Sequence, residues 1–250
     1  MRCPRLSPLL LLLLAALVAG CATQRPASQL SADSRLHVAD AAAAAGDDDL
    51  AASLYAAAAA NAPHDTAVQL RAAAALAKVG KISQARQVLA RRLQAAPDDL
   101  DAVRARAGLD LGEGRIAEAV AALDGALATR PEDPATLADK GVALDLQAQH
   151  AAAQVLYRRA LRAAPNDPAI CNDLALSLLL QGRIHEGIAV LAPLEDAPSL
   201  PVRARATLAL LYALDGQGER SRSVLGHDLP DGYVAEVAKA VNTGRSLPSS

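Results

Sequence analysis

The hydrophobic positions of this chain do not alternate as they do in a half-buried strand. No sustained run of period two, rich in Val, Ile, Thr and aromatic residues, occurs in the 250 residues. Apolar residues make up 52% of the chain, but Phe and Trp are absent and alanine supplies much of that fraction. Alanine is the best helix former and buries little area, so it suits thin layers in which helices approach closely. The pattern therefore predicts an all-α fold.

A second regularity is a set of evenly spaced prolines. Pro63, Pro97, Pro131 and Pro165 follow one another at intervals of 34 residues, in the similar contexts NAPHD, AAPDD, TRPED and AAPND. A period of 34 residues is that of the tetratricopeptide repeat (TPR), in which each repeat is a pair of antiparallel helices. With proline at position 32, the frame gives the repeats 32–65, 66–99, 100–133, 134–167, 168–201 and 202–235.

Four further positions of this frame carry the residue types that the repeat requires. Positions 8 and 20, where the two helices come closest, hold only Ala, Gly or Ser. Position 24 holds Leu or Tyr, and position 15, in the turn between the helices, holds Gly in five repeats and Ala148 in the fourth. Glycine there suits a helix C-terminus that needs a positive φ. Chance patterning of an alanine-rich chain does not account for the spaced Pro and Gly.

The frame predicts a right-handed superhelical TPR solenoid of about six helix pairs within residues 32–241. A lone helix pair cannot bury its apolar stripe, so each pair is expected to stack on the next. Three prolines are expected to end the second helix of the fifth repeat early and to leave a bend or loop over 192–201. Residues 231–241 are expected to form a short terminal helix over the open end of the stack, and residues 242–250 a disordered tail.

Residues 1–20 have the features of a cleaved export signal, because two arginines precede an apolar run too short to span a bilayer. The run ends in Val-Ala-Gly-Cys, which resembles the lipobox of bacterial lipoproteins. The resemblance implies acylation of Cys21, with palmitate or a similar chain, and cleavage before it. Ala22 implies, by the same resemblance, the outer membrane. An ordinary signal peptide with an incidental Cys is the alternative, and residues 21–31 are expected to be a tether.

The remaining composition argues against several function classes. Net charge is −2 and no basic stripe with interleaved aromatics occurs, so nucleic-acid binding is not expected. Cys171 is expected to be a small buried hydrophobe, and no disulfide framework is possible. His185 and Glu186 begin an HExxH motif, but Ala189 replaces its second histidine, and no G-x-S-x-G turn is present. We therefore expect no catalytic residue, metal site, cofactor or small-molecule substrate.

A protein partner is expected to bind in the concave groove that the first helices of the repeats line. Positions 2, 5, 6, 9, 12 and 13 of those helices face the groove in this frame. Asn172 and Asp173 either hydrogen-bond an extended peptide backbone or are merely solvated. The groove lacks the Lys, Arg and Asn set with which TPR domains clamp a carboxyl terminus, so an apolar or helical partner segment is expected. The candidate groove residues are Asp101, Arg104, Asp139, Val142, Asp145, Asn172, Asp173 and Leu179.

A closer family resemblance is carried by residues 141–194, whose sequence is GVALDLQAQHAAAQVLYRRALRAAPNDPAICNDLALSLLLQGRIHEGIAVLAPL, and by the ending that follows. This stretch resembles the TadD family, the TPR lipoproteins of tight-adherence (Flp) pilus assembly. With the leader and Cys21, the resemblance covers nearly the whole chain. The chain departs from it at residues 171–173, where a pair of Asn is expected, and at Gly187, which replaces the usual Ala.

The resemblance implies an outer-membrane lipoprotein whose TPR part faces the periplasm. It also implies a pilotin-like or scaffold role toward a secretin or another pilus component. A generic envelope TPR scaffold, for outer-membrane protein insertion or polysaccharide export, is the alternative. A TPR-bearing envelope hydrolase is a third hypothesis, against which stands the missing catalytic constellation.

Overall fold

Twelve α helices and one 3-10 segment make up the described part of the chain, residues 32–198 and 200–225 of a computed structural model, and no strand occurs in that part. The predicted all-α class is confirmed. The helices are α2 (Ala32–Ala44), α3 (Asp48–Asn61), α4 (Thr66–Lys78), α5 (Ile82–Ala95), α6 (Leu100–Gly112), α7 (Ile116–Thr129), α8 (Pro134–Leu146), α9 (His150–Ala163), α10 (Pro168–Leu180), α11 (Ile184–Leu191), α12 (Val202–Leu214) and α13 (Gly218–Leu225).

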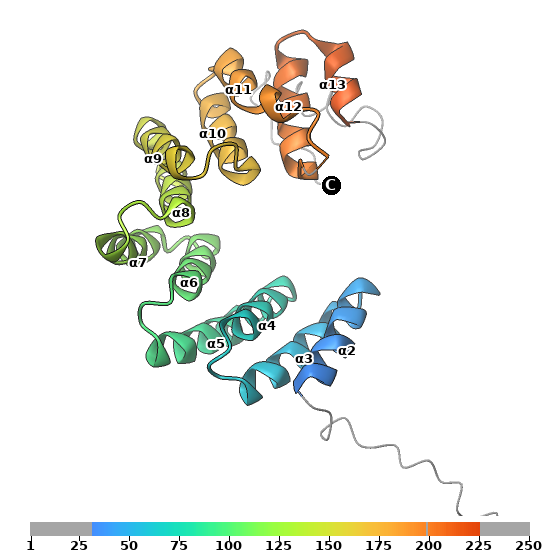
Figure 1. Cartoon of the computed structure of the whole chain (residues 1–250), viewed down its shortest axis with the longest axis vertical. Helices are drawn as coiled ribbons and strands as arrows, with labels where there is room; N and C mark the ends of the chain where they lie inside the picture. Colours follow the sequence, from blue (N-terminus) through green and yellow to red (C-terminus); the bar gives the residue numbers. More distant parts are fainter. Residues whose placement is uncertain (1–31, 199, 226–250) are drawn as a thin grey trace, which may run out of the picture.

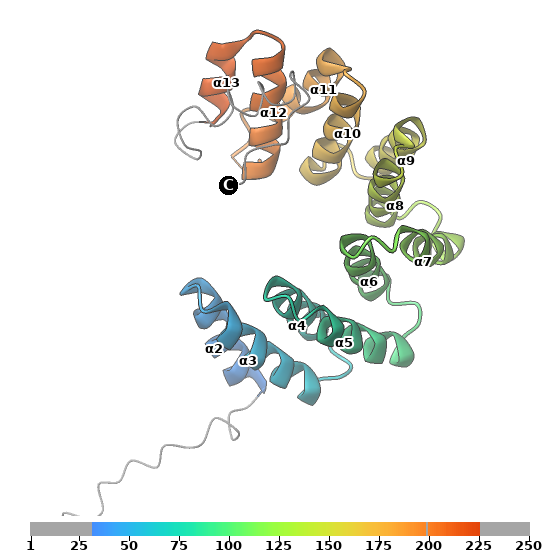
Figure 2. The same cartoon turned by 180° about the vertical axis from the view of Figure 1, so that it is seen from behind.

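The helices form consecutive pairs that stack into an open arc (Figure 1). The first helices of the middle pairs, α4, α6, α8 and α10, lie on the inner side of the arc, and α5, α7, α9 and α11 lie on the outer side. The view from behind shows the same order (Figure 2). From α4 to α12, the first helices begin every 34 residues, at the first position of each repeat in the frame. The predicted stack of six helix pairs is confirmed, and its inner side is the concave surface.

Small residues at the closest-approach positions allow the helices of each pair to pack tightly. A Cβ added to Gly141 would lie 2.5 Å from Cε1 of Tyr157, so the tyrosine ring packs directly on the glycine backbone. A Cβ added to Gly187 would lie 3.1 Å from Cδ2 of Leu211 on α12. Larger side chains here would force the helices apart. The buried small residues are Ala39, Ala73, Ala107, Gly141, Ala175 and Ala209 at position 8, and Ala51, Ala85, Ala119, Ala153, Gly187 and Ser221 at position 20.

Each spaced proline is followed two residues later by an aspartate that caps the next first helix. Asp99 accepts a hydrogen bond from the N–H of Ala102 at 3.1 Å. Asp65, Asp133 and Asp167 make the equivalent bond at the starts of α4, α8 and α10. Such a cap satisfies an N–H group that has no partner within the helix and typically contributes about 1 kcal/mol. The Pro-x-Asp sequence therefore helps to set the residue at which each first helix begins.

The turn inside each pair passes through a left-handed residue at position 15. Gly182 has a φ of +71°, and its N–H donates to the carbonyl of Leu179 at 2.8 Å, which closes the end of α10. The fourth repeat has Ala148 at this position, with a φ of +58°. An L residue adopts that conformation at a cost of about 1–2 kcal/mol, which explains the preference for glycine in the other repeats.

The second helix of the fifth repeat ends early, as its prolines predict. α11 has 8 residues against 14 in α9, and is followed by η2 (Ala192–Leu194) and an irregular connection to α12. Glu195 in this connection accepts a hydrogen bond from the Tyr212 hydroxyl at 2.7 Å and pairs with Arg220 at 2.8 Å. The Arg220 guanidinium lies 4.1 Å from the centre of the Tyr212 ring. These contacts fasten the connection to α12 and α13.

Some of the expectations concern residues that lie outside the described part. They are the leader 1–20, Cys21 with the tether 21–31, the terminal helix 231–241 and the tail 242–250. Among the described helices, none is both long and apolar enough to cross a membrane.

Replacing Ala148 with glycine is expected to stabilise the fold by about 0.5–1 kcal/mol. Glycine removes the cost of the left-handed backbone, although its greater freedom in the unfolded chain offsets part of the gain. Gly182→Ala, the reverse change at the same position of the next repeat, is the matched control and should cost about 1 kcal/mol. Urea unfolding of the parent and both variants measures the two changes. Equal stability of Ala148→Gly and the parent would contradict the argument.

Candidate partner-binding groove

The concave surface is built from one stripe of each first helix, at positions 2, 5, 6, 9, 12 and 13 of the repeat. The stripes of α6, α8 and α10 are neighbours, because α8 packs against both α6 and α10 (Figure 1). All eight residues predicted for the groove lie on these three helices. The repeat therefore brings together residues that are far apart in the sequence.

Arg104 on α6 is the centre of one charged group in the groove. Its Nε lies 2.6 Å from Oδ2 of Asp139 on α8, and its Nη1 lies 3.4 Å from Oδ1 of Asp101. Burial raises the pKa of Asp139, and the positive charge of Arg104 opposes that rise. The structure thus brings three of the predicted residues together, and their ion pairs join neighbouring repeats. The charge of Arg104 is already balanced within the chain.

Asp145 lies where three helices meet. Its Oδ1 accepts a hydrogen bond from the hydroxyl of Ser177 on α10 at 2.8 Å, and its Oδ2 accepts one from Tyr157 on α9 at 2.9 Å. His150 Nδ1 lies 2.8 Å from Asp145 Oδ1. Burial, followed by the Asp145 charge, raises the pKa of Tyr157 and so keeps its hydroxyl a donor. Asp145 therefore fixes the relative positions of α8, α9 and α10.

Asn172 lies between two repeats rather than on the open surface of the groove. Its side chain accepts a hydrogen bond from the hydroxyl of Thr207 on α12 at 2.7 Å, and the residue is 3% exposed. Its Nδ2 lies 3.3 Å from Oδ1 of Asp173 and donates to it. The amide is thus engaged within the chain, so the recognition of a partner backbone would fall to neighbouring side chains.

Asp173 is a half-buried carboxylate that has no ion pair within residues 32–198 and 200–225. Burial is the main cause that raises its pKa. The bond from Asn172 and the charge of Arg203 oppose this rise, and the carboxylates of Asp139 and Asp145 add to it. A partly desolvated carboxylate that no cation pairs directly is unfavourable in its charged form. Asp173 therefore offers a favourable contact to a cation that a partner brings into the groove.

Three leucines that our residue prediction missed form the exposed apolar part of the groove. Leu146, Leu176 and Leu180 are 56%, 38% and 65% exposed, and we call them the leucine strip. Leu146 is at position 13 of the fourth repeat, and Leu176 and Leu180 are at positions 9 and 13 of the fifth, so the same frame that gave the polar candidates contains them. The predicted Val142 and Leu179 lie on the same stripes and are half-buried. Large exposed side chains on neighbouring helices mark a surface for an apolar partner.

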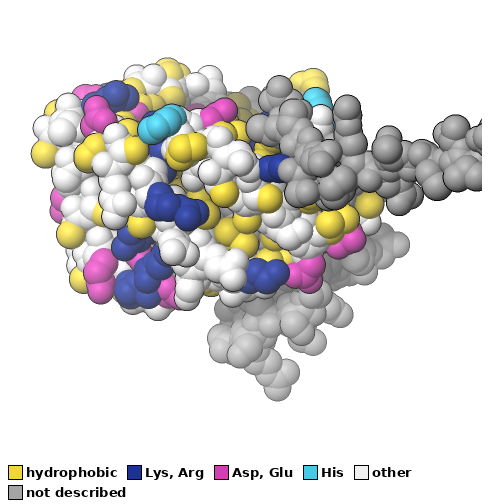
Figure 3. Space-filling model, turned by 90° about the horizontal axis from the view of Figure 1, so that it is seen from below, with side chains coloured by type: hydrophobic (Ala, Val, Ile, Leu, Met, Phe, Trp, Pro, Cys, Tyr) yellow, Lys and Arg dark blue, Asp and Glu magenta, His cyan; other side chains and the backbone are white. Residues whose placement is uncertain are grey.

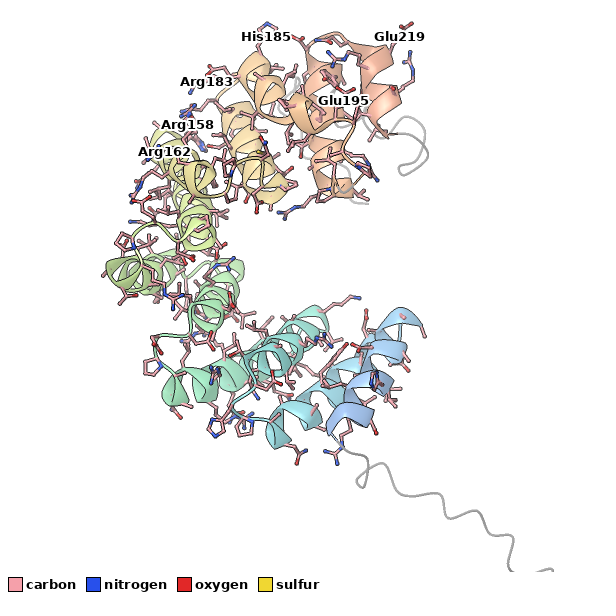
Figure 4. The ribbon with its side chains drawn as sticks, in the orientation of Figure 1. Arg158, Arg162, Arg183, His185, Glu195 and Glu219 are labelled. Atoms are coloured by element: carbon pink, nitrogen blue, oxygen red, sulfur yellow. The ribbon has the colours of Figure 1, made fainter. Side chains whose placement is uncertain are left out.

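The arginines that Figure 4 labels lie on a different side of the molecule from the strip. Figure 4 shows Arg158 and Arg162 of α9, together with Arg183, on the outer side of the arc. Seen from below, in Figure 3, hydrophobic side chains are interspersed with separate basic and acidic ones. The remaining exposed large hydrophobics of the described part are dispersed over other helices; they are Val38, Leu50, Val155 and Val202.

Comparison with known proteins agrees with this geometry. A tetratricopeptide-repeat family model matches residues 110–170. The crystal structure of a tetratricopeptide repeat protein from Parabacteroides merdae is similar, with 12% identity and a TM-score of 0.68 over 88% of this chain and 87% of that one. This chain has the TPR fold.

Two further solved structures have a similar fold, and one of them is named as a pilus biogenesis factor. PilW, a widely conserved type IV pilus biogenesis factor, has 19% identity and a TM-score of 0.59, over 77% of this chain and 90% of its own. Pseudomonas aeruginosa PilF has 14% identity and a TM-score of 0.59, over 86% of this chain and 97% of its own. No curated protein matches the chain in sequence.

His185 and Glu186, which begin the incomplete HExxH motif, lie beside charged side chains of the TPR solenoid. His185 Nδ1 lies 2.9 Å from Asp215, and Glu186 pairs with Arg183 at 2.5 Å. The described residues contain no group of three or more His, Cys, Asp or Glu that could hold a metal ion. Cys171 is 4% exposed and burial raises its pKa, so it packs as the small hydrophobe that the sequence predicts.

Asp173→Asn is expected to raise the melting temperature at pH 7 but not at pH 3. A pKa that is higher in the folded than in the unfolded chain favours folding below the ordinary value of 3.8, and this advantage is lost as pH rises through the folded value. The uncharged amide avoids that loss at neutral pH. Asp196→Asn, at an exposed carboxylate, is the control and should change little at either pH. An equal gain at both pH values would exclude the desolvated carboxylate as the cause.

Proposed function

We propose that this chain is a lipid-anchored outer-membrane TPR protein that binds another protein in its concave groove and serves the assembly of a tight-adherence (Flp) pilus machine, without catalysing a reaction. The leucine strip is the observation that carries the binding role, because it leaves Leu146, Leu176 and Leu180 exposed on neighbouring helices. Each of these side chains is about half exposed, so covering it contributes about 1 kcal/mol, roughly half of what full burial of a leucine provides. Contact with the strip alone would therefore supply a useful part of a micromolar affinity.

The partner segment that suits this groove is an amphipathic helix with an apolar face and a basic side chain. Its apolar face would cover the leucine strip, as in other complexes where a helix lies in a groove. Its cation would reach Asp173, whose charge no residue of the described part pairs directly. Pairing a partly desolvated carboxylate with a donor removes a cost that the free protein bears. Leu176, Leu180 and Asp173 lie on one stripe of α10, so the two kinds of contact can be made together.

The pilus role rests on two likenesses of different kinds. Residues 141–194, the leader and Cys21 resemble TadD lipoproteins, which implies an outer-membrane location and a secretin or other pilus-assembly component as partner. The fold is similar to that of PilW, a type IV pilus biogenesis factor. TPR solenoids present extended surfaces to proteins, which supports an assembly factor rather than an enzyme.

Leu180→Asp is expected to reduce capture of the partner by at least tenfold, because a charge replaces an apolar contact at the most exposed point of the leucine strip. The matched control is Val155→Asp, since Val155 is 57% exposed but lies on α9, outside the groove. Crosslinking in the living host, followed by identification of the captured proteins, is the measurement. Equal capture by both variants would rule out the groove, and capture without any secretin or pilus component would rule out the pilus role.

Cys21→Ser is expected to release the mature protein from the outer-membrane fraction. Acyl chains contribute about 0.8 kcal/mol per buried CH₂, so several chains on one cysteine hold a protein on the membrane durably. Cys3→Ser, within the leader, is the control and should leave the protein in the membrane fraction. Membrane fractionation with mass measurement of the amino-terminal peptide tests both. An unmodified Cys21 in the mature chain would show that the export signal is of the ordinary kind.

A further inference from the structure

A cavity of about 540 Å³ lies between α5, α6 and α7, and we call it the third-repeat cavity. Apolar walls come from all three helices, including Leu93, Val103 and Ala122. Arg106 and Asp110 also line it, and the exposed residues Asp98 and Glu118 lie at its rim. Its volume is in the range of pockets that bind ligands, and it is large enough to hold several side chains. The groove and the cavity use different stripes of α6, since Arg104 serves the first and Arg106 the second.

The cavity exists because the third repeat lacks two large side chains that other repeats have. Position 11 is Leu or Tyr in the second, fourth, fifth and sixth repeats, but it is Asp110 in the third. Position 23 is Leu or Val in the five other repeats, but it is Ala122 in the third. Gly125 also lines the space, and a Cβ added there would meet nothing within 4 Å. The smaller side chains therefore leave an apolar pocket, open to solvent, where other repeats present larger ones.

The polar groups beside the cavity are only partly satisfied. Asp110 is 3% exposed and forms ion pairs with Arg86, Arg106 and Arg115. Arg106 Nε lies 3.3 Å from Asp110 Oδ2 but makes no hydrogen bond to it, so this buried N–H has no acceptor in the described part. A buried donor without an acceptor costs about 1–3 kcal/mol. The lining of the cavity therefore includes a buried donor that the fold leaves unsatisfied.

Two carboxylates at the rim of the cavity favour a ligand that carries positive charge. Asp98 and Glu118 are exposed, and neither side chain has a hydrogen bond or an ion pair with any other described residue. A ligand that enters between them meets two negative charges before it reaches the apolar walls. Complementary charges at a rim select partners and speed their encounter.

We propose that the third-repeat cavity receives apolar side chains of a partner protein segment that carries Lys or Arg on either side of them. The apolar side chains occupy the space that Leu at positions 11 and 23 would fill in another repeat. The flanking cations pair with Asp98 and Glu118. The solenoid then has two protein-binding sites, one on each side of α6.

Ala122→Leu is the variant that separates this proposal from simple loose packing. It restores the residue type found at position 23 elsewhere, so the cavity fills while the fold keeps or gains stability. Ala121→Leu, at an exposed position of the same helix, is the matched control. The charge variant Glu118→Lys, at an exposed site, tests the rim without depending on how the core repacks.

The measurement begins with selection of random displayed peptides on the full-length chain, and it continues with affinities of the selected peptides for the parent and the variants. We expect one class of peptides with apolar residues flanked by Lys or Arg. This class should lose at least tenfold in affinity on Ala122→Leu and on Glu118→Lys, but keep its affinity on Ala121→Leu and on the groove variant Leu180→Asp.

Absence of such a class would overturn the proposal. So would selected peptides without basic flanks, or peptides that bind Ala122→Leu as tightly as the parent. If only Leu180→Asp weakened binding, the groove alone would be the binding site. Ala122→Leu that unfolds at a lower temperature than the parent would leave Glu118→Lys as the deciding variant, and undiminished binding to it would also reject the proposal.

Discussion

The close approach of two helices at small residues is the constraint on which the rest of this solenoid depends. A chain without Phe or Trp cannot fill wide gaps between helices, so it must bring backbones together. Ala and Gly at positions 8 and 20 permit this, and the ring of Tyr157 on Gly141 is the tightest described case. Because each pair is held in this way, one stripe of every first helix remains on the concave surface. The groove is thus a consequence of where the small residues lie.

The fold was predictable because its determinants are local and recur. Proline, the capping aspartate two residues later and the left-handed residue of the turn each act within a few residues of the chain. Repetition then makes a weak local preference into a clear pattern. The early end of α11 followed from the same logic, since proline cannot continue a helix.

Whether the candidate groove residues are free or engaged within the chain was harder to predict, because this depends on contacts with residues one repeat away. Asn172 and Thr207 are 35 residues apart in the chain, as are Arg104 and Asp139. The frame predicts that such residues face one side, but not whether their side chains reach each other. The leucine strip was missed for a related reason. A leucine in a helical stripe has the same pattern whether a neighbour covers it or not, and only the packing shows that Leu180 is uncovered.

The same physical principle connects the groove with the third-repeat cavity. In both places the chain leaves apolar surface uncovered beside a polar group that the free protein satisfies poorly, the Asp173 carboxylate in one and Nε of Arg106 in the other. Each arrangement lowers the stability of the free fold, and a ligand that covers the apolar surface returns part of that free energy as affinity. A stack in which every repeat followed the pattern fully would be more stable, but it would have less surface that favours a partner.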